Sequence, residues 1–203
     1  MQIVLGSASK YRAELLRRII TNFHQDSPDI DETAQPGEAP EVLAQRLAVE
    51  KAHAIAGRWR DSLIISSDQV AVLDYQQGAG DGSESRLSKP GNFDNAMQQL
   101  QRCSGHCVTY ITACCLLNTN SMQNQVFTEY YRLHFRTLSE RQIAAYLNAE
   151  QPYDCAGAIK SEGLGVALVH RYEGDDPTAL IGLPLIRLTD ALANEGLSIL
   201  DMV

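Results

Sequence analysis

Two serine hydroxyls and two cations crowd into six residues near the start of the chain. They are Ser7, Ser9, Lys10 and Arg12. They follow the apolar run 2–5 and precede a segment with a helical pattern, 11–20. This order predicts a strand, a tight turn and a helix. A helix N-terminus carries unpaired backbone N–H groups and the positive end of the helix dipole, so it binds anions. We therefore expect a phosphorylated ligand at this turn.

Two charged residues break apolar patterns further along the chain. Lys51 stands in the apolar stripe of an expected helix, 41–58, where another apolar side chain was due. Asp68 stands inside the apolar, strand-like run 63–73, where a carboxylate is costly unless it is paired, bound to a metal or functional. The plainer interpretations are a lysine that snorkels to solvent and a solvated aspartate at a strand end or bulge.

Together these residues make up a set that can hydrolyse a phosphoanhydride. Asp68 and Glu32 are carboxylates that can hold a divalent cation, although an acidic loop pair such as Asp31-Glu32 is usually just solvated. The cations available for phosphate oxygens are Arg12, Lys51 and Lys89. The reaction needs neutralised phosphate charge, a metal and a positioned, deprotonated water. Mg²⁺ prefers one or two carboxylates plus substrate oxygens to a cage made of protein alone.

Other chemistries fit the chain less well. The serine-hydrolase pattern G-x-S-x-G and the Walker A pattern are absent, and none of the five histidines has a clear partner. The five cysteines are an odd number without a C-x-x-C pair. We therefore expect reduced, mostly buried thiols and neither disulfides nor a zinc site.

The elements that must position these residues alternate between helix and strand patterns. The expected helices are 11–20, 41–58, 93–102, 139–149 and 184–194, and the expected strands are 2–5, 63–73, 107–117, 126–135 and 164–172. Ser139 and Gln142 form a capping-box pattern at the start of the fourth helix. The segment 75–88 is rich in Gly, Ser and Gln and is expected to be a long, mobile loop. The alternation and the hairpin predict an α/β fold with a mixed sheet in one domain, residues 1–203.

Composition and charge narrow the class of protein. Hydrophobic residues make up 44% of the 203 residues and charged residues 21%, which is ordinary for a soluble globular protein. The net charge of -8 argues against charge-driven binding to nucleic acid or to an anionic membrane. No stretch approaches the roughly 20 apolar residues of a membrane span, and the N-terminus lacks a signal pattern. We expect a cytoplasmic protein with no nucleic-acid or membrane partner.

Motifs along essentially the whole chain resemble, in the right order, those of the Maf-like nucleoside triphosphate pyrophosphatases. The matching segments are S-x-S-x-x-R at 7–12, D-E at 31–32, R-L-A-x-x-K-A at 46–52, S-D-Q at 67–69, K-P at 89–90, S-G at 104–105, C-A-G-x-x-K-S-E-G at 155–163, E-G-x-D at 173–176 and G-L-P-L at 182–185. Together the motifs are highly specific, although each alone is weak. Two features depart from the family: Lys10 stands where proline is common, and the loop 75–88 is longer than usual just before Lys89.

The resemblance implies a role for each candidate residue. Asp68 is then the catalytic carboxylate that activates water or anchors the metal that does. Glu32 helps to hold that metal, Mg²⁺ or Mn²⁺, and Lys51 completes the catalytic set. The residues implied to bind the triphosphate are Ser7, Ser9, Arg12, Lys51 and Lys89. The implied products are a nucleoside monophosphate and pyrophosphate.

The resemblance also implies a fold and an assembly. The expected architecture is an elongated mixed sheet flanked by helices, with two lobes around a nucleotide-binding cleft, as in the inosine triphosphate pyrophosphatases. The substrate is then a nucleoside triphosphate, and a homodimer is the common assembly.

The branch of the family is indicated by two short segments. Members that act on dTTP and UTP carry A-D-T and I-Q-G, where this chain has S-D-Q at 67–69 and S-E-G at 161–163. These variants resemble the branch that hydrolyses 7-methyl-GTP, and the resemblance places Tyr11, Gln69 and Glu162 at the positions that tune base choice. N7-methylguanine is positively charged, so a carboxylate at 162 favours it over a neutral pyrimidine, and Tyr11 can stack on it.

Two alternatives stay open at the level of sequence. The first is the same chemistry on dTTP and UTP. The second is a nucleotide-binding regulator of septum formation that needs no catalysis. The presence of Glu32, Lys51 and Asp68 favours an enzyme, because a pure binder need not retain a carboxylate that activates water.

Overall fold

The computed structural model describes residues 1–74, 76–77 and 85–202. In this part of the chain the strands form one seven-stranded mixed sheet in the order β2-β1-β3-β5-β6-β7, with β4 paired to β3. The strands are β1 (Gln2–Leu5), β2 (His24–Gln25), β3 (Ser62–Leu73), β4 (Arg86–Leu87), β5 (Cys107–Asn118), β6 (Asn124–Phe135) and β7 (Val169–Glu173). The helices are α1 (Lys10–Arg17), α2 (Pro40–Ala56), α3 (Phe93–Cys103), α4 (Glu140–Glu150), α5 (Pro177–Ile181) and α6 (Leu185–Asn194). Short 3₁₀ turns cover Ala156–Ala158, Leu164–Leu168 and Ile199–Met202.

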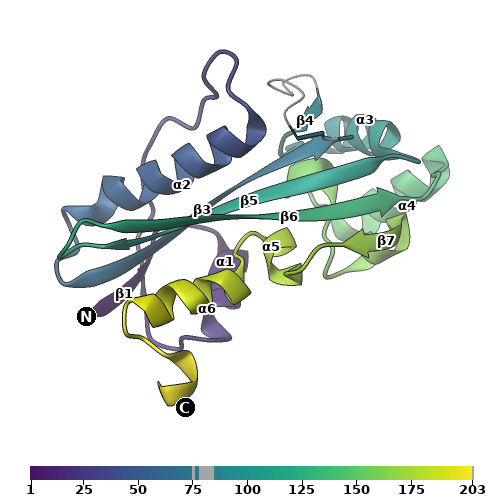
Figure 1. The fold of residues 1–203 in the computed structure, drawn as a ribbon. Coiled ribbons are helices and arrows are strands. Elements are labelled where there is room, and N and C mark those ends of the chain that lie inside the picture. The colour runs from purple at the N-terminus through teal and green to yellow at the C-terminus, as the bar shows by residue number, and fades with distance from the viewer. Residues whose placement is uncertain (75, 78–84, 203) are drawn as a thin grey trace.

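Three long strands give the molecule its elongated shape. β3, β5 and β6 have 12 residues each and run through the whole structure (Figure 1). β3 and β5 are buried along nearly their full length, because helices cover both faces of the sheet. α2 packs on one face, α1 and α6 lie on the other, and α3 and α4 gather at the far end (Figure 1). The expected α/β fold with an elongated mixed sheet is thus confirmed.

The edge of β3 has a gap between two short partners. β1 runs parallel to residues 62–65, and β4 pairs antiparallel with residues 71–72. Within the described chain, residues 66–70 pair with β5 alone. The chain leaves β1 at Leu5 and turns into α1 beside this gap, so the opening turn and the middle of β3 lie next to each other.

The expected strand 164–172 is wrong in its first half. Residues Leu164–Leu168 form a 3₁₀ turn, and the strand β7 begins only at Val169. The N–H of Gly165 donates to the carbonyl of Lys160, and a Cβ at Gly165 would lie 2.4 Å from that oxygen. The backbone therefore folds tightly onto the preceding segment, and only glycine allows this approach.

Other differences concern short elements. α5 was not expected, although Asp176 as N-cap and Pro177 at the first helical position are ordinary start signals. In the expected loop 75–88, Arg86 and Leu87 form β4, and residues 75 and 78–84 lie outside the described residues. The expectation that this loop is mobile is therefore not tested.

Among the described residues, no helix combines the length and the apolar character that a membrane crossing requires.

Candidate active site

A pocket of about 760 Å³ opens at the gap in the edge of β3. Every candidate residue from the sequence lines it: Ser7, Ser9, Tyr11, Arg12, Glu32, Lys51, Asp68, Gln69, Lys89 and Glu162. The lining also includes residues that received no role in the sequence analysis, among them Arg86 and Asp154. Asp68 and the first helix, which are more than 50 residues apart in the sequence, thus meet at one opening, as expected.

The turn after β1 is built by its own serines. Ser9 is the N-cap of α1, and its hydroxyl accepts a hydrogen bond from the backbone N–H of Arg12 at 3.3 Å. The hydroxyl of Ser7 accepts from the N–H of Ser9 at 3.2 Å. Lys10 is the first helical residue, a position that proline also favours, so the departure from the family pattern leaves the helix start intact. Its ammonium lies 4.9 Å from the ring centre of Tyr11.

Hydrogen bonds to the opening turn and to the segment after α5 hold Arg12 in place. Its Nε donates to the carbonyl of Gly182 at 2.9 Å, and its Nη1 lies 3.4 Å from the hydroxyl of Ser7. Gly182 has φ +115°, and a Cβ there would lie 3.2 Å from Nε, so glycine permits this close approach. Burial lowers the pKa of Arg12, whereas the charge of Asp68 raises it. The guanidinium stays charged, because its ordinary pKa is far above neutrality.

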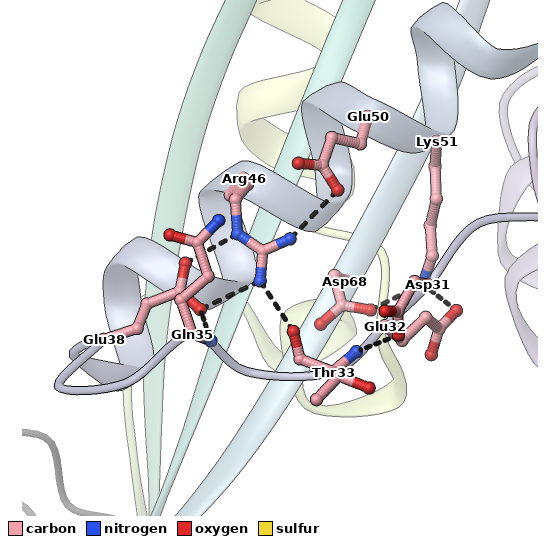
Figure 2. A network of polar contacts seen from close by, with 9 residues as sticks. All are labelled: Asp31, Glu32, Thr33, Gln35, Glu38, Arg46, Glu50, Lys51 and Asp68. Carbon is pink, nitrogen blue, oxygen red and sulfur yellow. Dashed lines mark hydrogen bonds and ion pairs between the residues drawn. The ribbon is translucent and has the colours of Figure 1, made fainter.

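Lys51 bridges the two carboxylates that the sequence assigned to the metal (Figure 2). Its Nζ lies 2.6 Å from Oδ1 of Asp68 and 2.7 Å from Oε1 of Glu32. Lys51 and Asp68 are only 7% and 8% exposed, so the lysine does not snorkel to solvent and the aspartate is not solvated. Both plainer interpretations are therefore wrong.

The surroundings shift the two carboxylates in opposite directions. Burial raises the pKa of Asp68 above its ordinary value, against the opposing charges of Lys51 and Arg12. Burial also acts on Glu32, but there the hydrogen bond and charge of Lys51 prevail and lower the pKa. The arrangement therefore provides one carboxylate that is more basic than usual beside one that stays ionised.

These donors fit a hard divalent cation that is shared with a substrate. In the described chain, no three His, Cys, Asp or Glu side chains gather into an all-protein metal site. Asp68 and Glu32 nevertheless converge on one ammonium group, so two carboxylates face the same small volume. One or two carboxylates completed by substrate oxygens and water is the donor set that Mg²⁺ prefers.

The loop that carries Glu32 is clamped onto α2 by an arginine (Figure 2). Arg46 binds Glu38 through two parallel contacts, Nε to Oε1 at 2.7 Å and Nη2 to Oε2 at 2.9 Å. Its Nη2 also donates to the carbonyl of Thr33 at 3.1 Å. Thr33 follows Glu32 directly, so the clamp fixes the backbone next to the carboxylate that meets Lys51. The bidentate geometry is the strong form of this ion pair.

The clamp predicts an acid-dependent loss of stability. The hydrogen bonds from Arg46 hold the pKa of Glu38 at about 2, against an ordinary value of 4.5. A lowered folded-state pKa contributes stability above pH 4.5, and this contribution is lost as the pH falls toward 2. We expect Glu38→Gln to lower the free energy of unfolding at pH 7 and to have a smaller effect at pH 3. Urea titrations of both proteins at the two pH values measure this, and an equal effect at both contradicts it.

The other end of the pocket lies on the opposite face of β3. Successive strand residues point to opposite faces, so Gln69 points away from Asp68 toward α5. Its Nε2 donates to the carbonyls of Ala179 at 2.9 Å and Leu180 at 3.0 Å. These two acceptors fix the orientation of the amide. It also contacts the hydroxyl of Thr112 at 2.9 Å.

Two carboxylates surround Tyr11 at this end. Burial, the neighbouring Cys155 thiol and the carboxylates of Asp154 and Glu162 raise the pKa of Tyr11 to about 12. Ser161 donates to Oε2 of Glu162 at 2.8 Å, which holds that exposed carboxylate beside the pocket. The negative groups and the aromatic ring make this end of the pocket suited to a flat cation. The family motifs pointed to Glu162 and Tyr11, but sequence reasoning missed Asp154, because this residue breaks no local pattern in its loop.

Comparison with known proteins gives a consistent result. A family model described as "Maf-like protein" matches residues 2–195. A protein of Colwellia psychrerythraea named 7-methyl-GTP pyrophosphatase is 46% identical over 198 residues, which cover 98% of this chain and 94% of the relative. A protein of Pseudomonas aeruginosa with the same name is 48% identical over 197 residues, which cover 97% and 98% of the two chains.

Solved structures support the fold. The Ham1 protein of Staphylococcus aureus matches with a TM-score of 0.52 and 15% identity, over 96% of this chain and all of that one. A HAM1 protein of Coxiella burnetii matches with a TM-score of 0.50 and 13% identity, over 96% and 99% of the two chains. At these identities the likeness concerns the fold alone.

Proposed function

This chain belongs to the Maf-like family, and we propose that it is a nucleoside triphosphate pyrophosphatase with 7-methyl-GTP as its preferred substrate. The observation that carries the proposal is the contact of Lys51 with both Asp68 and Glu32 in a pocket that begins at the N-terminus of α1. Relatives close to half identical over nearly the full chain carry the name 7-methyl-GTP pyrophosphatase. The same name across relatives from several bacteria favours this substrate over dTTP and UTP.

The triphosphate binds at the start of α1. Backbone N–H groups of the turn and the hydroxyls of Ser7 and Ser9 face its oxygens, and Arg12 and Lys89 supply positive charge. A divalent cation, Mg²⁺ or Mn²⁺, held by Glu32 and Asp68 supplies further neutralisation of the phosphates when bound. Lys51 keeps the two carboxylates apart and oriented before the substrate arrives.

Asp68 takes the proton of the attacking water. Burial raises the pKa of this carboxylate, which makes it a better base, and the charges of Lys51 and Arg12 oppose this rise and favour the ionised form. The water attacks a phosphorus of the α,β-anhydride, and the bond from that phosphorus to the bridging oxygen breaks. The products are the nucleoside monophosphate and pyrophosphate.

A substrate panel tests the proposal. Purified protein is incubated with 7-methyl-GTP, GTP, dTTP or UTP and with Mg²⁺ or Mn²⁺, and pyrophosphate release is measured. We expect the highest kcat/KM with 7-methyl-GTP. Equal or faster turnover of dTTP and UTP would overturn the choice of base, and binding without any turnover would favour the regulator. The cytoplasmic location and the homodimer stay predictions.

The end of the pocket that is lined by Tyr11, Gln69 and Glu162 is called the base end here, because we expect it to hold the nucleobase. The charge of Glu162 at this end predicts a change in selectivity for the nucleobase. We expect Glu162→Gln to lower the ratio of kcat/KM for 7-methyl-GTP to that for GTP about 2- to 5-fold, because an exposed charge pair contributes roughly 0.5–1 kcal/mol. Asp190→Asn serves as the matched control, because Asp190 is an exposed residue of α6 that does not line the pocket. The measurement is initial rates with both nucleotides, and an unchanged ratio in Glu162→Gln removes the residue from base choice.

A further inference from the structure

We propose that Asp176 is a positioning residue that holds the nucleotide pocket in shape from behind, a role that rests on the proposed function. The E-G-x-D motif that contains Asp176 matched the family, but nothing in the chemistry above uses it. Asp176 is 2% exposed and does not line the pocket. It lies where β7 leads into α5, at the start of the corner formed by residues 176–186 (Figure 1).

Three hydrogen bonds tie this carboxylate to both helices of the corner. Oδ1 accepts from the N–H of Thr178 at 2.8 Å and from its hydroxyl at 2.6 Å. Oδ2 accepts from the N–H of Ile186 at 2.9 Å. The hydroxyl of Thr178 in turn accepts from the N–H of Leu185 at 2.9 Å. Asp176 and Thr178 therefore fasten the start of α5 to the start of α6.

The corner held in this way supplies the carbonyl groups that orient two pocket residues. The carbonyls of Ala179 and Leu180 accept from Nε2 of Gln69. The carbonyl of Gly182 accepts from Nε of Arg12 at 2.9 Å and from the hydroxyl of Ser67 at 2.8 Å. One buried carboxylate thus holds the backbone that orients both Arg12, at the phosphate end, and Gln69, at the base end.

Among the described residues, the side chain of Asp68 has no hydrogen bond to this corner, and the charge of Arg12 links the two. Asp68 points to the opposite face of β3, where its contacts are with Lys51 of α2. A displaced corner should therefore weaken binding of the substrate and its discrimination, and it should change the chemical step much less. This separation distinguishes positioning from a general loss of structure.

Asp176→Asn and Thr178→Val test the inference. All three groups that meet Asp176 are donors, so an asparagine turns its own NH₂ toward a donor in either orientation. Thr178→Val removes the hydroxyl that links the two helices, and Thr178→Ser keeps it. Glu195→Gln is the matched control, because it weakens carboxylate contacts with Asn118 and Gln125 just past the other end of α6, away from the pocket.

We expect Asp176→Asn and Thr178→Val to raise KM for 7-methyl-GTP roughly 10- to 100-fold, with kcat changed less than about threefold, as for a small misplacement of binding groups. The preference for 7-methyl-GTP over GTP should fall as well. Thr178→Ser and Glu195→Gln should behave like the wild type. A fall in kcat that matches the rise in KM in all four variants, or an unchanged KM in the first two, would overturn the role.

A readout without turnover separates this inference from the proposed function. The Nε–H of Arg12 and the side-chain amide of Gln69 give assignable NMR signals that report the bonds to the corner. We expect both signals to shift and to lose protection from solvent exchange in Asp176→Asn and Thr178→Val only. If the wild type fails to hydrolyse any nucleotide, the proposed function is wrong, and these signals still decide whether Asp176 positions the two side chains.

Discussion

Asp68→Asn is expected to lower kcat for pyrophosphate release from 7-methyl-GTP by about two to four orders of magnitude, because the reaction loses its general base. The asparagine keeps the shape of the side chain but cannot take a proton from water. Nucleotide binding should survive, since the turn at α1, Arg12 and Lys89 are untouched. Stopped or continuous assays of pyrophosphate release measure kcat, and equilibrium titration measures binding.

The stability of this variant provides the control. Burial raises the pKa of Asp68, so the ionised carboxylate is disfavoured by the fold above its unfolded-state pKa. A neutral amide removes this cost, while Lys51 keeps its contact with Glu32. We therefore expect a midpoint of thermal unfolding within a few degrees of the wild type. Full turnover in a folded Asp68→Asn protein would show that the base has been misassigned.

Lys51→Met is expected to lower kcat/KM by about 10²- to 10³-fold, the usual cost of removing a preorganised charge from an active site. It leaves two carboxylates facing each other without the ammonium between them. Because the charge of Lys51 lowers the pKa of Asp68, its removal should raise that pKa further. The acid limb of the profile of kcat/KM against pH should then move to higher pH.

Lys51→Arg separates charge from geometry. It keeps the positive charge on the same helix position, so the acid limb should stay near its wild-type pH even if the rate falls. Profiles of kcat/KM for the three proteins between about pH 5 and 9 give the comparison. An acid limb that stays in place in Lys51→Met would contradict the coupling of Lys51 to the base.

The residues that break a local pattern were the ones that sequence predicted best. Asp68 in an apolar strand and Lys51 in an apolar helix stripe each pointed to a partner, and the structure shows that they are partners of each other. The register of β1 against β3 then brings the turn at Ser7 to the same place. Periodicity and turn signals also predicted the long strands and most of the helices, because these elements follow from local patterns in the sequence.

The sequence did not reveal features that depend on contacts between distant segments. The corner at 176–186 is held by Asp176, which is an ordinary N-cap in the sequence. The backbone carbonyls of the corner meet Gln69 only because β3 passes next to the corner in the fold. Asp154 joins the base end from a loop without periodicity. The segment 164–168 was predicted to be a strand because its residues are mostly apolar. That pattern does not indicate the close packing of Gly165 against the backbone of Lys160. In each case the deciding partner is far away or is a backbone atom.

The most direct measurement is the identity of the products formed from 7-methyl-GTP by the wild type and by Asp68→Asn, side by side, with Mg²⁺ present. Our account predicts one 7-methyl-GMP and one pyrophosphate for each nucleotide that the wild type consumes, and almost none from the variant. Formation of 7-methyl-GDP with inorganic phosphate, or equal yields from the two proteins, would contradict it.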